Sequence, residues 1–489
     1  MSDVQTRREM RLLLNDQPIT LREVASRDTL LDFLRIERRL KGTKEGCAEG
    51  DCGACTVLVG QFRGGALVYE PVNACIRLLP TLDSCHVVTV EHLAEPGGAL
   101  NPVQEAMVKL HGSQCGFCTP GIVVTLFALL MNVPDPSVDQ IEEALQGNLC
   151  RCTGYGPIIA AAQEAAREGG VAARLESQRE AVSAQLHNWA DGARVEVERD
   201  GDRAILPASV DDFAAVYEAH PDATIVAGAT DVGLWITKFL KDISPAIFIA
   251  HLDDLRQMEV SGGKLTLGAG ASYTDCQALL AEHFPHLGPF WARIAGWQVR
   301  NMGTVGGNIA NGSPIGDTPP TLIALGATLT LRKGDARRTI PLEDFFIDYG
   351  KQDRAKGEFV EAIHIPLPNE TARSGAYKIS KRRESEISSV CGAITVEVEG
   401  DTITSARIAF GGMAATPKRA RHAETALKGQ PWHEDTVRAA MDAIAKDYDP
   451  ISDHRASAEY RADVAANLLM RFWLEQGGSD VRLIREAAE

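Results

Sequence analysis

The chain has 489 residues, a formal net charge of −16 at pH 7, and a hydrophobic share of 45% that is ordinary for a globular protein. Its length suits roughly three or four domains with separate cores. The negative charge disfavours nucleic acid and anionic membrane surfaces as partners, so we expect neither. With no apolar signal-like start and no apolar run long enough to cross a bilayer, the sequence predicts a cytoplasmic protein.

Residues 1–95 predict a small β-rich domain in which Leu12–Leu14 and Ile19–Val24 flank a turn and form a hairpin. Four cysteines follow the C-x4-C-x2-C…C spacing of a plant-type [2Fe-2S] site: Cys47, Cys52, Cys55 and Cys75. The glycines between them let the backbone wrap tightly around bound sulfur. A structural zinc site is the alternative, but zinc sites usually join two close pairs of cysteines.

Residues 96–168 predict a helical domain with a second set of cysteines: Cys115, Cys118, Cys150 and Cys152. The first pair precedes Thr119, an expected N-cap, and the apolar helix Ile122–Met131, while the second precedes the Ala-rich helix Ile158–Ala166. Helix N-termini favour an anion such as a thiolate-bound iron-sulfur cluster. This spacing is less diagnostic by itself, so zinc stays open here too, although the neighbouring ferredoxin-type loop favours iron.

Eleven cysteines in a chain without an export signal favour metal ligation over disulfides, because cytosolic thiols are kept reduced. The one residue between Cys150 and Cys152 also disfavours a disulfide between them. The three remaining cysteines lie in apolar or strand contexts and are predicted to be buried, inert thiols: Cys85, Cys276 and Cys391.

After a linker predicted at 169–203, residues 204–372 contain two glycine-rich segments. In the first, a strand at Ala223–Ala227 runs into Gly228 and then into a helix at Val232–Leu240, an order that suits a pyrophosphate or an ordinary βα turn. The second, Thr304–Asp317, has four glycines and is predicted to be too irregular for a helix or strand. It could bring backbone close to a ligand, with Asp317 accepting from sugar hydroxyls, or form a surface loop. Together they predict a long nucleotide in a cleft.

Residues 373–489 predict an α+β domain, so the whole chain is predicted to be a multidomain α+β protein. A hairpin turns at Gly400-Asp401. Three helical segments follow it: His422–Leu427, Asp435–Lys446 and Ala458–Gln476.

Six segments occur in the order of a known family: Gly42 to Thr56, Gly112 to Gly121, Gly147 to Gly156, Ile225 to Val232, Thr304 to Asp317 and Lys378 to Ile387. By these segments the chain resembles the small iron-sulfur and flavin subunits of the molybdenum hydroxylase (xanthine oxidase) family, those of bacterial two-subunit xanthine dehydrogenases in particular. The resemblance implies a β-grasp ferredoxin-like domain, a helical-bundle [2Fe-2S] domain, an α+β FAD-binding domain and a C-terminal α+β flavoprotein domain.

The resemblance also implies the cofactor contacts. The eight cysteines named above would hold two [2Fe-2S] clusters, and Gln114 would touch the pterin. The implied FAD contacts are Ile225, Val226, Ala227, Gly228, Ala229, Thr230, Asp231, Val232, Ile294, Thr304, Val305, Gly306, Gly307, Asn308, Asp317, Val360 and Lys378. Ile294 is a departure, because animal members carry an aromatic residue there.

The implied activity is electron transfer from hypoxanthine or xanthine oxidation, through both clusters to FAD and then NAD. Nothing in the chain resembles the molybdopterin-binding domains, so we expect a large partner subunit, an (αβ)2 heterotetramer, and no residue here that catalyses hydroxylation. We also expect Arg382, Glu384 and Glu386 near the flavin edge. Two alternatives stay open: a related hydroxylase for an aldehyde or N-heterocycle, and a zinc-stapled binding module.

Overall fold

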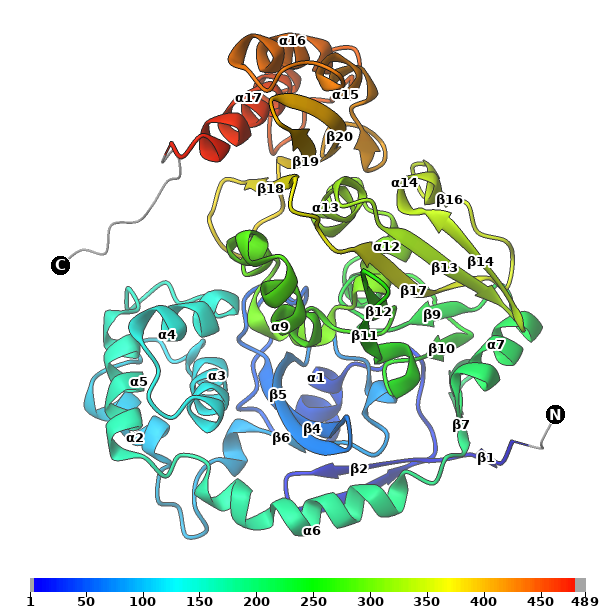
Figure 1. The fold of residues 1–489 in the computed structure, drawn as a ribbon. Helices are drawn as coiled ribbons and strands as arrows, with labels where there is room; N and C mark the ends of the chain where they lie inside the picture. The colour runs from blue at the N-terminus through cyan, green and yellow to red at the C-terminus, as the bar shows by residue number, and fades with distance from the viewer. Residues whose placement is uncertain (1–3, 480–489) are drawn as a thin grey trace.

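The computed structural model describes residues 4–479. Figure 1 shows the two N-terminal domains, in blue and cyan, side by side below a green central domain, with the orange and red C-terminal domain above it. This multidomain α+β arrangement confirms the predicted fold class. Among the described residues, no helix is both long and apolar enough to span a bilayer.

The first domain is a five-stranded mixed sheet in the order β3-β2-β6-β4-β5. Its elements are β2 (Met10–Leu14), β3 (Gln17–Leu21), β4 (Thr56–Arg63), β5 (Ala66–Asn73), β6 (His86–Val88), α1 (Leu30–Asp32), the π-helical turn η1 (Phe33–Glu37) and the 3-10 turns η2 (Leu79–Leu82) and η3 (Val90–His92). The predicted hairpin is confirmed by antiparallel pairing of Leu12 with Ile19. Leu30 and Phe33 bury their side chains with those of the sheet.

His86 in β6 is a buried histidine whose two ring nitrogens are both used. Nε2 lies 2.8 Å from the Asn15 carbonyl and must donate to it, so Nδ1 accepts from the Tyr69 hydroxyl, also at 2.8 Å. Burial lowers the pKa of His86 to about 4, because the charged ring would lose its hydration. The neutral ring is therefore part of the folded state.

Acid is expected to weaken the first domain through His86. Its folded pKa lies below the unfolded value of about 6.5, so its stabilising effect is full above pH 6.5 and is lost as pH falls towards 4, by about 3 kcal/mol. Chemical unfolding of wild type and His86→Gln at several pH values measures this. An equally steep loss of stability between these pH values in His86→Gln would contradict the assignment.

The helical domain contains α2 (Pro102–Lys109), α3 (Thr119–Asn132), α4 (Val138–Ala144), the 3-10 turn η4 (Leu145–Gly147) and α5 (Gly156–Glu168). The apolar helix is buried from Gly121 to Leu130, as predicted. Its N-cap is Cys118 and not Thr119, so the predicted cap was one residue late. The shift matters because it places a thiol directly at the helix start.

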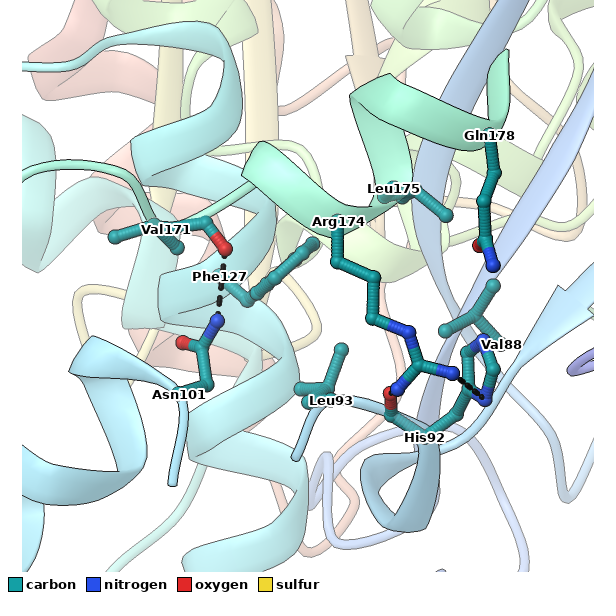
Figure 2. Close-up of a pocket in the computed structure, with 9 residues that line it drawn as sticks. All are labelled: Val88, His92, Leu93, Asn101, Phe127, Val171, Arg174, Leu175 and Gln178. Atoms are coloured by element: carbon teal, nitrogen blue, oxygen red, sulfur yellow. Dashed lines mark hydrogen bonds between the residues drawn. The ribbon is translucent and has the colours of Figure 1, made fainter. Parts of the chain in front are cut away.

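The segment predicted as a linker contains α6 (Ala173–Trp189), which runs beneath both N-terminal domains in Figure 1. Figure 2 shows how it is anchored. Arg174 donates to the carbonyls of His92 and Ala94 and to the Asp16 carboxylate, and Asn101 donates to the Val171 carbonyl. The cavity at this joint is only about 10 Å³, the space of about one water, so it is a packing joint.

The third domain is built on two sheets. The first has the order β1-β7-β8-β10-β9. Its strands are β1 (Thr6–Arg7), β7 (Arg194–Arg199), β8 (Asp202–Leu206), β9 (Thr224–Val226) and β10 (Ala246–Phe248). Its helical elements are α7 (Val210–Ala219), α8 (Val232–Thr237) and the 3-10 turn η5 (Asp253–Arg256). Thr6 pairs with Arg194. Thr6–Arg7 and part of the predicted linker therefore belong to this sheet.

The second sheet has the order β11-β12-β17-β13-β14. Its strands are β11 (Met258–Ser261), β12 (Lys264–Gly268), β13 (Thr328–Lys333), β14 (Ala336–Pro341) and β17 (Phe359–Pro366), beside a small hairpin of β15 (Phe346–Asp348) and β16 (Lys351–Gln352). Its helices are α9 (Tyr273–His283), η6 (Pro285–Leu287), α10 (Gly288–Trp291), α11 (Trp297–Met302), α12 (Val305–Asn311), α13 (Thr318–Ala324) and α14 (Leu342–Phe345). Leu265, Leu329 and Ile363 share one core with residues of α9, α12 and α13.

The C-terminal domain has a four-stranded antiparallel sheet of β18 (Ala372–Ile379), β19 (Val390–Glu399), β20 (Thr402–Gly411) and β21 (Lys418–Arg419). Its helices are α15 (Arg421–Leu427), α16 (Glu434–Ile444) and α17 (Ala458–Gln476), which confirms the three predicted segments. The predicted hairpin at Gly400-Asp401 is also present. Cys391 and Ala409 join the core of the third domain, so the two domains pack together.

Candidate functional site

The first set of cysteines comes together around the loop before β4. The thiol of Cys47 interacts with those of Cys52 and Cys75, and the Cys75 thiol also interacts with that of Cys55. Cys55 and Cys75 are buried and the other two are half-buried. The neighbouring thiols, and then backbone N–H groups of Cys52 and Glu49, lower the pKa of Cys47, while the same contacts with Cys47 raise the pKa values of Cys52 and Cys75.

The loop wraps these thiols because its glycines allow it to. Gly50 and Gly53 have φ of +80° and +70°, where a side chain would be strained. A Cβ on Gly46 would lie 2.7 Å from Cys52 Sγ. Two backbone N–H groups, those of Glu49 and Cys52, point at Cys47 Sγ from 3.4 Å. This donor set and these N–H groups fit a thiolate-held iron-sulfur cluster.

The second set lies where α3 begins and before α5. Cys118 caps α3, and its thiol interacts with that of Cys150. Burial raises the pKa of Cys118 to about 12. At Cys150 burial acts in the same direction, but the Thr153 hydroxyl, 3.1 Å away, and a backbone N–H outweigh it and lower the pKa. Cys115, Cys152 and Gln114 are exposed at this end of the domain.

The thiol contacts in both sets are pairwise. Across residues 4–479, no three His, Cys, Asp or Glu side chains are grouped so that they could hold one metal ion. The other three cysteines are buried as predicted. Burial raises the pKa of Cys85 to about 11, and it raises the pKa values of Cys276 and Cys391 as well. All three are therefore protonated, unreactive thiols at neutral pH.

The two glycine-rich segments of the third domain meet at Gly228. A Cβ on Gly228 would lie 1.7 Å from the Met302 carbonyl oxygen and 3.0 Å from Gly303 Cα. The turn after β9 therefore packs against the backbone that leads into Thr304. Ala229 beside it has φ +60°, and burial raises the pKa of Asp231. The structure brings the predicted segments 225–232 and 304–308 side by side.

The first half of the second segment is helical, which corrects the prediction there, whereas residues 312–317 are irregular as predicted. Residues 305–311 form α12, whose N-cap Thr304 accepts from Gly307 N at 3.0 Å and whose end is set by Gly312 at φ +64°. Its glycines allow close packing, because a Cβ on Gly306 would lie 2.4 Å from that of Ala269. Asn308 Oδ1 is buried with no hydrogen-bond partner, which leaves it free to accept from a ligand.

Asp317 and Lys378 form a buried polar group with Ser388, which sequence reasoning missed. Lys378 Nζ lies 2.6 Å from Asp317 Oδ2 and 2.9 Å from Ser388 Oγ, and the Ser388 hydroxyl donates to Asp317 Oδ1 at 2.5 Å. No periodicity or motif marks Ser388. Val360 and Ile294 are buried in the core of the third domain.

The loop between β18 and β19 connects this region to the thiol sets. Arg382 pairs with Glu386 at 3.1 Å and lies 3.9 Å from Asp51, next to Cys52. Ser385 Oγ donates to the Gln146 carbonyl at 2.8 Å. Glu384 pairs with Arg383 at 3.1 Å. The charged residues predicted near a flavin edge thus lie partly against the thiol domains.

Four domain families match the chain in order. Residues 12–76 match a 2Fe-2S iron-sulfur cluster binding domain, and residues 89–163 match a [2Fe-2S] binding domain. Residues 199–368 match the FAD binding domain in molybdopterin dehydrogenase, and residues 375–476 match the CO dehydrogenase flavoprotein C-terminal domain. The two thiol sets and the two glycine segments each fall inside the corresponding domain.

Curated relatives match nearly the whole chain. Xanthine dehydrogenase of Emericella nidulans is 33% identical over 525 residues, covering 95% of this chain and 38% of that protein. Xanthine dehydrogenase/oxidase of Rattus norvegicus is 30% identical, covering 95% and 39%, and aldehyde oxidase 1 of Bos taurus is 30% identical, covering 96% and 39%. The chain therefore spans about two-fifths of the length of these relatives.

Solved structures match a smaller part of the chain. The Cu,Mo-CO dehydrogenase is similar with a TM-score of 0.52 and 26% identity, covering 55% of this chain and 94% of that one. Quinoline 2-oxidoreductase from Pseudomonas putida 86 is similar with a TM-score of 0.50 and 27% identity, covering 56% and 96%. Each of these solved chains corresponds to little more than half of the present one.

Proposed function

Since this chain belongs to the iron-sulfur and flavin part of the molybdenum hydroxylase family, we propose that it is the electron-transfer subunit of a xanthine dehydrogenase. In this proposal a large molybdopterin-binding partner oxidises hypoxanthine and xanthine. The chain carries the electrons through two [2Fe-2S] clusters to FAD and delivers them to NAD. Two copies of each subunit form an (αβ)2 heterotetramer in the cytoplasm.

One observation carries the proposal: the two sets of thiols and the two closely packed glycine segments belong to one continuous packed structure. Eight of the eleven cysteines fall in the two sets. Oxidation of a purine releases two electrons, whereas iron-sulfur sites carry them singly. A bound FAD accepts single electrons and returns two as a hydride, which suits NAD as the acceptor.

We assign the binding and positioning of these cofactors to residues of this chain. We assign Cys47, Cys52, Cys55 and Cys75 to one cluster, and Cys115, Cys118, Cys150 and Cys152 to the other. Gly228 and Asn308 are assigned to the FAD pyrophosphate and ribityl regions. Lys378 balances the charge of Asp317 and fixes its orientation, so that its remaining lone pairs can accept from FAD hydroxyls.

The xanthine dehydrogenase proposal rests on the relatives that match nearly the whole chain. The relatives that match about 95% of the chain include fungal and mammalian xanthine dehydrogenases. The chain spans about two-fifths of their length, and we assign the molybdopterin-binding part to a separate polypeptide. Gln114, exposed beside Cys115, is assigned to that interface.

Analysis of the intact protein tests the proposal. We expect the anaerobically purified chain to contain about four irons and one FAD, and to be coloured. We expect a large molybdopterin-binding chain to copurify, and the pair to reduce NAD when given hypoxanthine. A colourless, zinc-containing protein without flavin would overturn the whole assignment and support a zinc-stapled module.

The second candidate is a related hydroxylase for an aldehyde or an N-heterocycle. Bovine aldehyde oxidase 1 matches 96% of the chain at 30% identity, only slightly below the fungal xanthine dehydrogenase. The substrate pocket is assigned to the partner, so this chain's residues do not separate the two. Oxidation of an aldehyde or of quinoline by the pair, with no activity on hypoxanthine, would favour the second candidate.

A further inference from the structure

Gln298, in α11 of the third domain, lies at the joint between the two thiol domains. Its side chain is fully buried. Its Nε2 lies 2.8 Å from Asn148 Oδ1, 3.0 Å from Thr125 Oγ1 and 3.3 Å from Thr56 Oγ1. These partners come from both thiol domains: Thr56 follows Cys55, and Asn148 lies two residues before Cys150. One amide thus joins three domains.

The residues around Gln298 link the loop segment at Cys52 and Gly53 to the segment that precedes Cys150. The Leu149 N–H donates to the Cys52 carbonyl at 2.9 Å, so a single hydrogen bond links a cysteine of the first set to the neighbour of Cys150. Beside it, Asn148 Nδ2 donates to the Gly53 carbonyl at 3.3 Å. Gln298 therefore anchors the residue adjacent to this bridge.

The segments around Gln298 are packed too closely to shift relative to one another. A Cβ on Gly147 would lie 2.1 Å from Gln298 Oε1, and a Cβ on Gly121 would lie 2.0 Å from the Gly53 carbonyl oxygen. Gln298 Oε1 is buried with no hydrogen-bond partner, so this amide is held here despite an unsatisfied acceptor. An unsatisfied buried acceptor lowers the stability of the fold, so we attribute the presence of Gln298 to the positions in which it holds its neighbours.

We propose that Gln298 is a positioning residue for electron transfer between the two clusters, an inference that rests on the proposed function. Gln298 holds together the two thiol domains, between which electrons pass one at a time. The cluster of the second set is oxidised by one electron and that of the first set is reduced by one, with no bond or proton change. Gln298 fixes the distance and the hydrogen-bonded contact between Cys52 and Leu149 on which the rate depends.

The test compares Gln298→Leu with a matched control in the same helix. Asn301 also joins α11 to the first domain, since its Nδ2 donates to the Pro71 carbonyl at 2.8 Å, but it does not touch the joint. Asn301→Leu therefore removes a buried interdomain hydrogen bond of the same kind. Thr125→Val, which deletes only the hydroxyl that Gln298 contacts in α3, serves as a second variant if Gln298→Leu fails to fold.

Three readouts are taken on the intact complex with its clusters and FAD bound. They are the rate at which flavin is reduced after one turnover of the partner, the magnetic interaction between the two reduced clusters by electron paramagnetic resonance, and the exchange rate of the Leu149 amide. Rates that require fixed geometry fall steeply with displacements of about 1 Å, so we expect Gln298→Leu to slow flavin reduction about tenfold. Thr125→Val should show a smaller effect in the same direction.

The outcomes separate positioning from general stability. A weaker magnetic interaction and faster Leu149 exchange in Gln298→Leu, with iron content and midpoint potentials retained, support the proposal. Equal slowing in Gln298→Leu and Asn301→Leu, or no slowing in Gln298→Leu and Thr125→Val, overturns it. Failure of the proposed function is recognised separately: a wild-type chain without iron and flavin is not an electron carrier, whereas a pair inactive on hypoxanthine but active on another substrate changes only the substrate.

Discussion

Replacing Cys75 by alanine is expected to halve the iron content of the chain while its FAD remains in place. Cys75 is 2% exposed, and its thiol interacts with those of Cys47 and Cys55, so its loss removes a proposed ligand from inside the first set. The second set belongs to another domain, whose helices pack against the first domain's sheet in a hydrophobic cluster that does not include Cys75, so it should keep its iron. Electrons from the partner subunit should then fail to reach the flavin.

Cys85→Ala is the matched control for this prediction. Cys85 lies in the same domain and core, is 5% exposed, and is assigned to neither set. Both substitutions remove a buried thiol of the same size, so any difference reflects ligation and not packing. Iron analysis and flavin reduction by the partner's substrate measure the effect. If Cys75→Ala and wild type contained the same amount of iron, Cys75 would not be a ligand of the cluster.

Local signals in the sequence predicted the two cysteine sets and several helices, among them α3 and α17. The C-x4-C-x2-C spacing brings three thiols together through one short loop, and the capping box between Ser137 and Gln140 depends only on neighbours in sequence. The apolar run of α3 is likewise a property of one segment. Such features are recoverable because the interactions that produce them span few residues.

Long-range contacts account for what sequence reasoning missed. The pairing of Thr6 with Arg194 places Thr6–Arg7 in the third domain, and neither segment carries a sequence pattern that predicts this pairing. The segment at 305–311 is helical despite its glycines, because Gly306 packs against Ala269 and tertiary contacts override weak helix propensity. Ser388 and Gln298 are single polar residues whose partners are distant in sequence, so nothing local marked them.

Replacing Gly228 by alanine is expected to release FAD while both clusters stay bound. The new Cβ would lie 1.7 Å from the Met302 carbonyl oxygen and 2.5 Å from its carbonyl carbon, so the backbone of one glycine segment must move away from the other. Overpacking of this kind costs about 1–3 kcal/mol, equivalent to roughly a 5- to 150-fold loss of FAD affinity if the strain is relieved when the two glycine segments separate.

Gly288→Ala provides the comparison, because a Cβ there meets no atom within 4 Å and the residue lies in the same domain. We expect it to retain FAD, as measured by flavin absorbance after gel filtration and by titration with added FAD. Iron content is measured alongside, because the cysteine sets lie outside the third domain and should be unaffected. If Gly228→Ala kept full FAD occupancy, the cofactor would not depend on the close approach of the two glycine segments. The assignment of 225–232 and 304–308 to FAD would then lose its structural basis.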